Sequence, residues 1–299
     1  MKVWLLGARG MLGQAAARLL AANKIPTLTT GREVDITRLE TLEQVPAAGV
    51  THIINCAAYT KVDDAESEEE LAGRVNGLGP THIGQIAAKL GAAAVHISTD
   101  YVFNGQAHSP YLEDHPTGPL NAYGRTKLQG EKGFMAASEG APEPFYLVRT
   151  SWLFGRGRHN FVTTMLRLMG DRKELSVVSD QRGRPTYCDD LARGCLRLLG
   201  ITGAPAPGGF YHFANSSKTT WHGFAEAILE LGRKRGMHLA CERINPIPTE
   251  DFPTPAERPA YSVLDTTKFS TATHSRPRPW KEALAEYIDH LAAEQGVNA

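Results

Sequence analysis

The chain of 299 residues is long enough to bury a large core, in one large domain or two interlocked ones. Its 32 basic and 32 acidic residues balance and no long run carries a single sign of charge, which argues against a nucleic-acid-binding protein. The N-terminal apolar run over residues 3–6 is too short for a signal peptide or a membrane span, so we expect a cytoplasmic protein with no membrane partner.

Cysteine and histidine patterns give no sign of a disulfide framework or a metal site. Cys56, Cys188, Cys195 and Cys241 are scattered without a Cys-x-x-Cys pair, which is typical of reduced, buried thiols. The eleven histidines show neither His-x-x-x-His nor His-x-His spacing, so we predict no metal ligand.

A glycine-rich turn follows the first predicted strand, residues 2–6. The pattern is GxxGxxG, with an alanine- and leucine-rich helical stretch after it. Glycines at such a point permit a tight turn, let the backbone approach a diphosphate and allow close helix–strand packing. The pattern predicts a dinucleotide-binding turn, and the alternative is a plain strand–helix turn. The residues expected at the cofactor are Gly7, Arg9, Gly10, Met11 and Leu12.

The end of the second predicted strand, residues 25–29, bears on which dinucleotide binds. An acidic residue there would bind the ribose of NAD, whereas an arginine would pair with the 2′-phosphate of NADP. Arg32, together with Arg9, favours NADPH, and Glu33 leaves NADH open. Two further cofactor contacts, over the adenine, are expected from Asp35 and Ile36.

The third predicted strand, residues 52–55, runs into small residues. Because small side chains at the carboxyl end of a parallel strand let a flat cofactor lie close, we expect Ala57, Ala58 and Tyr59 at the cofactor. Asn76 lies in the helix that follows, where its polar side chain is expected to brace the sheet and to belong to the cofactor site.

The fourth predicted strand, residues 93–98, delivers Thr99 to the same edge of the sheet. A hydroxyl there can donate a hydrogen bond to a substrate carbonyl oxygen that gains negative charge, and the alternative is a threonine that caps its own turn. The loop over residues 104–120 is long for a compact domain and therefore a candidate part of a site. Tyr123 and Lys127 follow, four residues apart on one face of a predicted helix.

The spacing of Tyr123 and Lys127 predicts a tuned acid. A positive charge one turn away favours the phenolate, so we expect Lys127 to lower the pKa of Tyr123 towards neutrality, where a tyrosine can act as a general acid or base. The alternative is a solvent-exposed pair without a role, because many helices carry this spacing.

Together these features resemble the extended branch of the short-chain dehydrogenase/reductase superfamily. The triad of that superfamily (Ser or Thr, Tyr and Lys) falls on Thr99, Tyr123 and Lys127, which are the catalytic residues that the resemblance implies. It also implies an α/β fold, a Rossmann-type doubly wound parallel sheet with a smaller C-terminal α/β substrate-binding domain. The nicotinamide cofactor would supply the hydride.

The two halves of the chain differ in pattern. From about residue 151 the alternation of strands and helices loosens and prolines become frequent. We expect an NADP-binding domain over residues 1–150 and a nucleotide-sugar domain over 151–299, with a segment near 186–213 returning to the first. Helices in the second half are predicted near 188–200, 221–236 and 280–295.

Within the superfamily, segments along the whole chain resemble the dTDP-4-dehydrorhamnose reductases. They are residues 98–103, 123–131, 149–152, 160–165, 180–186 and 258–265. The resemblance implies NADPH-dependent reduction of the C4 ketone of dTDP-4-dehydro-β-L-rhamnose to dTDP-L-rhamnose, the last step of dTDP-rhamnose synthesis for cell-surface polysaccharide. The substrate contacts it implies are Asp100, Tyr101, Trp152, Asn160, Arg182 and Arg258.

Several of these substrate contacts have alternatives. Trp152 packs against a sugar or fills the core, and Arg182 either holds a diphosphate or is a surface arginine. Related sugar-nucleotide dehydratases carry a glutamate where this chain has Tyr101, so elimination is disfavoured and reduction remains. Some family members bind Mg²⁺ between subunits through an acid shortly after the third glycine. Here that place is Ala15, which makes Mg²⁺ doubtful and leaves monomer or homodimer open.

Two other functions remain as rivals. One is a reductase or epimerase of another nucleotide sugar, because the superfamily motifs do not select the sugar. The other is a non-catalytic, NADP-binding regulatory subunit, against which the complete set of Thr99, Tyr123 and Lys127 argues, because a binding module needs no tuned acid.

Overall fold

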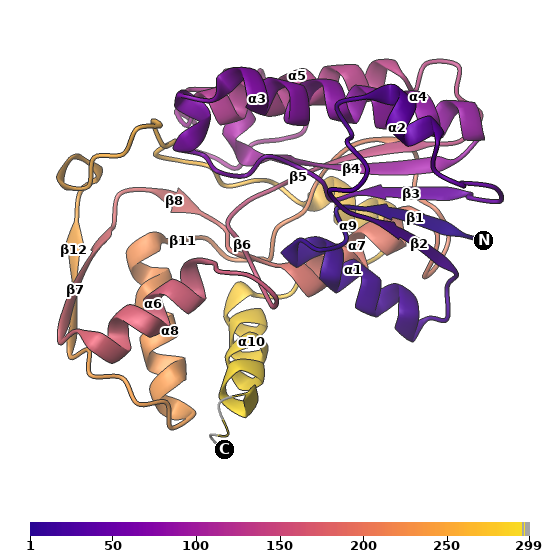
Figure 1. Ribbon diagram of the computed structural model, residues 1–299. Coiled ribbons are helices and arrows are strands. Elements are labelled where there is room, and N and C mark those ends of the chain that lie inside the picture. The colour runs from indigo at the N-terminus through magenta and orange to yellow at the C-terminus, as the bar shows by residue number, and fades with distance from the viewer. Residues whose placement is uncertain (295, 297–299) are drawn as a thin grey trace.

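The computed structural model describes residues 1–294 and 296. Its larger half is a six-stranded parallel sheet covered by helices on both faces, and its smaller half is built from short strand pairs and helices (Figure 1). The sheet strands are β1 (Val3–Leu6), β2 (Thr27–Thr30), β3 (His52–Asn55), β4 (Ala93–Thr99), β5 (Phe145–Thr150) and β10 (Gly209–His212).

The order of the strands places a crevice at the carboxyl ends of β1 and β3. The sheet runs β10-β5-β4-β3-β1-β2, and every neighbouring pair is parallel. Successive strands are therefore added in opposite directions from β1: β2 lies on one side of it, and β3, β4, β5 and β10 follow on the other. In doubly wound sheets ligands bind at such a switch point, beyond the carboxyl ends of the strands.

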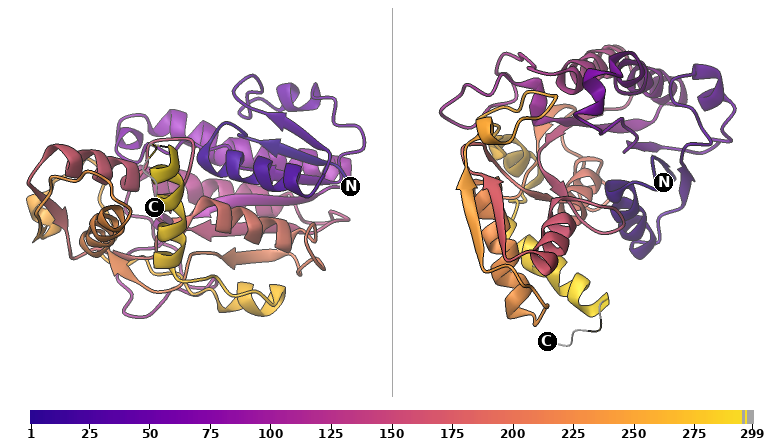
Figure 2. Two further views of the ribbon diagram at one scale, coloured as in Figure 1. Left: turned by 90° about the horizontal axis from the view of Figure 1, so that it is seen from below. Right: turned by 60° about the vertical axis from the view of Figure 1, so that its left-hand side comes forward.

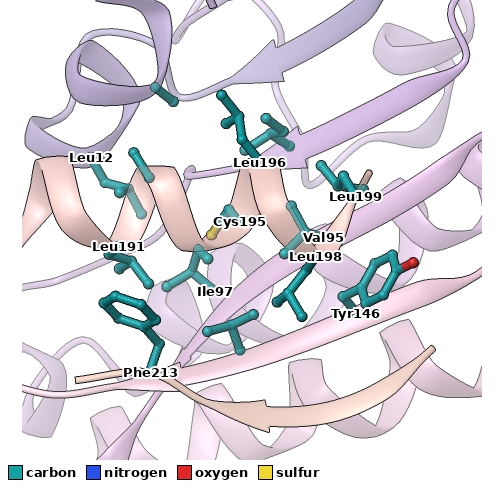
Figure 3. Close-up of a cluster of buried hydrophobic side chains, with 14 of the residues drawn as sticks. Leu12, Val95, Ile97, Tyr146, Leu191, Cys195, Leu196, Leu198, Leu199 and Phe213 are labelled. Atoms are coloured by element: carbon teal, nitrogen blue, oxygen red, sulfur yellow. The ribbon is translucent and has the colours of Figure 1, made fainter. Parts of the chain in front are cut away.

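Apolar side chains explain why these strands form the centre. All four residues of β1 and all seven of β4 are buried, as expected for strands covered on both faces. On one face lie α1 (Met11–Ala22), α7 (Cys188–Leu198) and α9 (Thr267–Thr273). Figure 3 shows this core, in which Leu12 of α1 and Leu191 of α7 gather with Val95 and Ile97 of β4.

The second face of the sheet carries the other helices of the first half. They are α2 (Leu39–Glu43), α3 (Glu69–Gly73), α4 (Gly79–Leu90) and α5 (Ala122–Ala136), with the short turns η1 (Asp64–Glu66), η2 (Arg74–Leu78) and η3 (Asp100–Val102). Glycines let α5 lie very close to its neighbours. A Cβ atom on Gly130 would lie 1.9 Å from the Asn76 carbonyl oxygen, and one on Gly124 would lie 2.2 Å from that of Tyr101. These contacts fix α5 against the end of β4.

The smaller half has its own core at one end of the molecule (Figure 2). Its strands pair as β6 (Leu153–Phe154) with β9 (Thr186–Tyr187), β7 (Glu174–Val178) with β12 (Arg243–Ile247), and β8 (Arg182–Gly183) with β11 (Thr219–Thr220). Its helices are α6 (Phe161–Asp171), α8 (Trp221–Lys234) and α10 (Trp280–Glu294), with a short η4 (Thr249–Asp251). Phe154, Phe224 and Tyr287 are among its buried side chains.

The predicted fold class is confirmed, with small shifts in element ends. The second strand begins at Thr27 rather than at residue 25, because the Ile25 N–H still closes the end of α1 on the Leu20 carbonyl oxygen. Helix α7 and strand β10 come from the segment near 186–213 and lie with the large sheet. Among the helices described, none has the length and apolar character needed to cross a membrane.

Candidate active site

The glycine turn between β1 and α1 is shaped by contacts that exclude side chains. Gly7 has φ +71°, and a Cβ atom on it would lie 2.6 Å from the Ala57 nitrogen. A Cβ atom on Gly13 would lie 2.2 Å from the Gly7 carbonyl oxygen. Helix α1 starts after Gly10 with no side-chain cap and no acidic residue in its first turn. Its first N–H groups are thus available to an anion, and the turn fits the diphosphate of a dinucleotide.

An arginine and an acid meet at the end of β2. Arg9 Nη2 lies 3.4 Å from Glu33 Oε2, and both side chains are largely exposed. Glu33 also accepts a hydrogen bond from the Gly31 N–H at 2.6 Å, and such backbone hydrogen bonds lower its pKa. Arg32 is exposed beside them. The groups that would favour NADPH and NADH therefore lie side by side at this edge.

Residues expected to cover the adenine have other partners. Asp35 Oδ1 accepts hydrogen bonds from the Thr37 N–H and hydroxyl, which closes a turn of the chain. The Ile36 side chain is buried in the core, where it packs closely against Gly79. The Ile36 side chain is thus covered by α4, and a contact of residue 36 with the adenine stays a prediction.

Asn76 and Asn55 hold the segment after β3. Asn76 is fully buried, accepts a hydrogen bond from the Tyr59 N–H at 2.8 Å and donates one to the Tyr59 carbonyl oxygen at 3.0 Å. Its amide thus braces the segment after β3, and its place in the cofactor site stays a prediction. Asn55 Oδ1 likewise accepts from the Ala57 N–H at 2.9 Å. Together they position residues 57–59, the segment expected at the cofactor.

Thr99, at the end of β4, caps its own turn, and its hydrogen bond to a substrate carbonyl oxygen stays a prediction. Its hydroxyl accepts a hydrogen bond from the Tyr101 N–H at 3.2 Å, which caps the turn η3, and donates one to Asp100 Oδ1 at 3.1 Å. Asp100 is almost fully buried, and its Oδ2 has no hydrogen-bond partner among the residues described. Burial raises the pKa of Asp100 to about 7.

Tyr123 and Lys127 lie on α5 beside these strand-end residues. Asn121 caps the helix by accepting from the Gly124 N–H at 2.8 Å. The Tyr123 ring packs edge-on against Tyr101, with ring centroids 5.8 Å apart. The Thr99 side chain lowers the pKa of the Tyr123 phenol, so the two side chains are neighbours. Thr99, Tyr101 and Tyr123 therefore meet at one corner of the crevice.

The expected lowering of the Tyr123 pKa is wrong for this structure. Burial raises the pKa of Tyr123 to about 12, and the negative charge of Asp100 acts in the same direction. The Lys127 nitrogen is directed elsewhere: it donates to the Ile97 carbonyl oxygen at 2.6 Å and lies 3.4 Å from His96 Nε2. The phenol therefore keeps its proton at neutral pH, which is the state that a general acid needs.

Two buried polar networks under the corner were missed in the sequence. Lys127 is only 2% exposed and contacts His96, which in turn contacts Asn55. A second network joins Glu131 of α5 to Arg149 of β5 by two hydrogen bonds of 2.9 and 2.7 Å. The available signal was a set of polar residues inside otherwise apolar strands.

A stack of two indoles lies on the side of the smaller half. Trp152 has φ +48°, an uncommon value for a large side chain, and its ring stacks on that of Trp221 with centroids 3.7 Å apart. A Cβ atom on Gly183 would lie 2.4 Å from the Trp152 ring. Trp221 donates from its indole nitrogen to Gln181 at 3.1 Å. Trp221 was not expected at the site, and it holds Trp152 in place.

The arginines expected at the substrate differ in their surroundings. Arg182 is exposed, which fits the alternative of a surface arginine and leaves a diphosphate contact open. Arg184 donates a hydrogen bond to the Leu264 carbonyl oxygen at 2.8 Å. Both terminal nitrogens of Arg258 donate hydrogen bonds to the Asp63 carboxylate, each at 2.8 Å. The ion pair joins the loop before Tyr261 to the loop after β3. Contact of Arg258 with a diphosphate would have to compete with this ion pair.

Asn160 is a helix cap in this structure. Its Oδ1 accepts from the Val162 and Thr163 N–H groups at 3.0 and 3.3 Å, and its Nδ2 donates to the Gly155 carbonyl oxygen at 2.8 Å and to the Tyr287 hydroxyl at 3.1 Å. Both ends of the amide have partners, so the expected substrate contact by Asn160, which stays a prediction, would have to compete with them. Asn160 and Thr163 form a capping box at the start of α6, a pattern that the sequence analysis did not identify.

Comparison with known proteins gives consistent results over the whole chain. The model of the RmlD substrate binding domain matches residues 1–293. The dTDP-4-dehydrorhamnose reductase of Streptomyces griseus is 42% identical over 98% of this chain and 95% of its own length. The probable dTDP-4,6-dihydroxy-2-methyloxan-3-one 4-ketoreductase of Streptomyces antibioticus is 38% identical over 97% and 96%. The crystal structure of dTDP-4-dehydrorhamnose reductase from Bacillus anthracis in complex with NADP is similar with a TM-score of 0.87 and 34% identity, over 97% of this chain and 99% of that one.

Proposed function

The chain belongs to the RmlD substrate-binding-domain family, that of the dTDP-4-dehydrorhamnose reductases, and on this premise we propose that it is an NADPH-dependent oxidoreductase. The reaction is reduction of the C4 ketone of dTDP-4-dehydro-β-L-rhamnose to dTDP-L-rhamnose. The observation that carries the proposal is the corner where Thr99 and Tyr123 meet beside the glycine turn of a doubly wound sheet.

The glycine turn and the ends of β2 and β3 would hold the dinucleotide. The first N–H groups of α1 bind its diphosphate, and Arg9 with Arg32 binds the 2′-phosphate. When bound, NADPH supplies the hydride that reduces the ketone carbon. A relative with 34% identity carries NADP in its crystal structure, which supports the choice of cofactor.

Tyr123 gives its proton to the alkoxide oxygen that forms at C4, and Thr99 donates a hydrogen bond to the same oxygen. Positioned acid catalysis contributes about 10²- to 10⁴-fold, and one oxyanion donor about 10²- to 10³-fold. Tyr123 is protonated at neutral pH because burial raises its pKa to about 12. The alkoxide is a still stronger base than this phenolate, so the proton transfer runs downhill.

Lys127, when charged, adds a positive charge on α5 one turn from Tyr123. It is buried and anchored on the Ile97 carbonyl oxygen, so its nitrogen stays at one place while Tyr123 changes charge. A fixed ammonium group stabilises the phenolate left after proton transfer.

Tyr101 is consistent with reduction rather than elimination. It occupies the position after Asp100, and burial raises its pKa well above the ordinary value for tyrosine. A neutral phenol there cannot take a proton from a sugar carbon at neutral pH. Asp100, the expected contact of a sugar hydroxyl, is buried, and its Oδ2 has no hydrogen-bond partner among the described residues.

Magnesium between subunits has no evident ligands near the glycine turn. Ala15 and Ala16, at the place where some family members have an acid, are buried in the core under the sheet. We therefore propose that the dTDP-sugar is bound without a metal-linked dimer. Size-exclusion chromatography with light scattering, with Mg²⁺ and with a chelator, would show the same mass in both conditions.

The decisive experiment follows NADPH absorbance with purified protein and dTDP-4-dehydrorhamnose, the product being identified by its sugar stereochemistry. Consumption of NADPH with formation of dTDP-L-rhamnose supports the proposal. No consumption at any protein concentration would contradict it.

A second candidate is 4-ketoreduction of a different dTDP-keto sugar. It is favoured by the 38% identity to the probable 4-ketoreductase of Streptomyces antibioticus, over 97% of this chain. The same absorbance assay distinguishes the two, because a higher kcat/KM with another dTDP-4-keto sugar than with dTDP-4-dehydrorhamnose would favour this candidate.

A further inference from the structure

A row of three buried polar side chains runs from β3 to the catalytic helix. Asn55 Nδ2 lies 2.9 Å from His96 Nδ1, and His96 Nε2 lies 3.4 Å from Lys127 Nζ. Asn55 and His96 are 0% exposed and Lys127 is 2% exposed, so the row is buried along its whole length. The mechanism above uses Lys127 alone and leaves Asn55 and His96 without a role.

The direction of the Asn55 amide is set by the backbone. Its Oδ1 accepts a hydrogen bond from the Ala57 N–H at 2.9 Å. Turning the amide over would place two donors, the Ala57 N–H and the Asn55 Nδ2, against each other inside the protein. The amide nitrogen must therefore face His96, and as a donor it needs a bare ring nitrogen at Nδ1.

The two nitrogens of His96 cannot both be bare or both carry a proton. Burial lowers the pKa of His96 well below its ordinary value, and the charge of Lys127 lowers it further, so the ring is neutral. A neutral imidazole with a bare Nδ1 carries its proton on Nε2, the nitrogen that faces Lys127.

We propose that Asn55 fixes His96 in the tautomer that carries its proton on Nε2, and that this N–H, directed at the Lys127 nitrogen, makes His96 a positioning residue that opposes the ammonium form of Lys127. With an uncharged amine, every group in the row has a partner: Lys127 accepts from His96 and donates to the Ile97 carbonyl oxygen. With an ammonium group at Lys127, two donors face each other. They are the Lys127 ammonium and the His96 Nε2–H or, if the ring changes tautomer, the His96 Nδ1–H and the Asn55 amide N–H.

The other groups around Lys127 do not remove this effect. Burial lowers the pKa of Lys127 to about 8, and Glu131, one turn further along α5, acts in the opposite direction. The Glu131 carboxylate is itself held by Arg149 of β5 and by the Ser98 hydroxyl of β4, which limits its influence. On its open side His96 faces the apolar ring of Phe134, with centroids 5.4 Å apart.

The effect of His96 on activity rests on the proposed function, whereas the arrangement of Asn55, His96 and Lys127 does not. If Lys127 must be charged for turnover, His96 lowers the pH at which activity falls off on the basic side. One unmade buried hydrogen bond corresponds to a shift of about one pH unit or more.

Nitrogen NMR of the histidine side chains in the full-length protein, with and without NADPH, tests the tautomer directly. His96, assigned by its loss in His96→Gln, should show its proton on Nε2. The chain has a built-in reference in His212, which is also fully buried but has Nδ1 at 3.1 Å from the Tyr111 carbonyl oxygen and should show the opposite tautomer. An Nδ1 proton or a charged ring at His96 would overturn the proposal.

Asn55→Asp tests the link to Lys127, because the new carboxylate accepts from both the Ala57 N–H and His96 Nδ1. The His96 proton should move to Nδ1, and the pKa of the Lys127 amine, followed by NMR titration and assigned with Lys127→Met, should rise by about one unit or more. The pH at which kcat/KM falls off on the basic side should rise by the same amount as the Lys127 pKa. A rise without a change of tautomer, or a change of tautomer without a rise, would overturn the proposal. Failure of the proposed sugar reaction would leave both NMR results decisive.

Discussion

Two buried charged sites lie beside each other where α5 packs on the sheet, and they are built in opposite ways. Glu131 and Arg149 pair through two hydrogen bonds, and Ser98 donates to the same carboxylate. Lys127 and Asp100 are equally buried, yet within the described part of the chain neither has an opposite charge at ion-pair distance. The first site joins α5 to β4 and β5. The second holds charges in surroundings that disfavour them, which is typical of a functional site.

The largest expected effect is on the paired site. Arg149→Met should lower the free energy of unfolding by about 3–5 kcal/mol, because it leaves the Glu131 carboxylate buried and unpaired. Denaturant unfolding measures the change. Adding Glu131→Gln to the same protein should recover much of the loss. A single variant that loses less than about 1 kcal/mol would show that the pair does not hold the helix.

Removing the unpaired lysine should have the opposite sign. The Lys127 pKa is about 8 in the folded protein against an ordinary 10.5, so the folded state binds fewer protons than the unfolded chain between these values. The free energy of unfolding therefore rises with pH across this window. Lys127→Met should raise stability at pH 7 by about 1–2 kcal/mol, after loss of the hydrogen bond to Ile97, and abolish the rise with pH.

The control for that variant lies on the same helix. Lys132 is exposed, and Lys132→Met should change the free energy of unfolding by no more than about 0.5 kcal/mol. If Lys127→Met destabilised the protein by more than the control at every pH, the view of Lys127 as a residue kept for function at the expense of stability would be wrong.

Asp100 should show a smaller effect with the reverse dependence on pH. Its pKa is raised from 3.8 to about 7, so the folded state binds more protons than the unfolded chain between these values, and stability falls as pH rises through them. Asp100→Asn should remove this fall and gain about 1 kcal/mol or more at pH 8. The exposed Asp114→Asn should leave the pH profile unchanged. Equal profiles for wild type and Asp100→Asn would contradict the burial of an unpaired charge.

The smallest effect is expected at an exposed pair, which lies outside both buried sites. Glu33 and Arg9 are more than half exposed, so Glu33→Gln should change stability by less than about 0.5 kcal/mol. It should nonetheless raise the preference for NADPH over NADH several-fold, because it removes a carboxylate beside the place proposed for the 2′-phosphate. An unchanged ratio of the two kcat/KM values would move the 2′-phosphate away from this pair.

The fold, and the corner where Thr99 and Tyr123 meet, could be predicted because local sequence determines them. Gly7 and Gly13 are required by contacts closer than any side chain permits, so the turn is visible as a pattern. Tyr123 lies in the first turn of α5 and Thr99 ends β4, so their meeting follows from the order of the elements.

The rest depended on partners distant in sequence. Arg258 pairs with Asp63, 195 positions away, and Trp221 of α8 reaches Trp152 in the turn after β5, which no spacing could indicate. The direction of the Tyr123 pKa shift was predicted wrongly. Helical spacing fixes the position of the Lys127 backbone, but it does not fix the direction of the side chain, whose nitrogen contacts the Ile97 carbonyl oxygen. Burial, which raises that pKa, is a property of the whole fold.

The central claim is that Tyr123 is the proton donor beside a bound nicotinamide, and Tyr123→Phe tests it most directly. NADPH binding, measured by fluorescence titration, should stay within about twofold of wild type, while kcat with dTDP-4-dehydrorhamnose should fall by about 10²- to 10⁴-fold. Turnover within tenfold of wild type, or loss of NADPH binding together with turnover, would contradict the account.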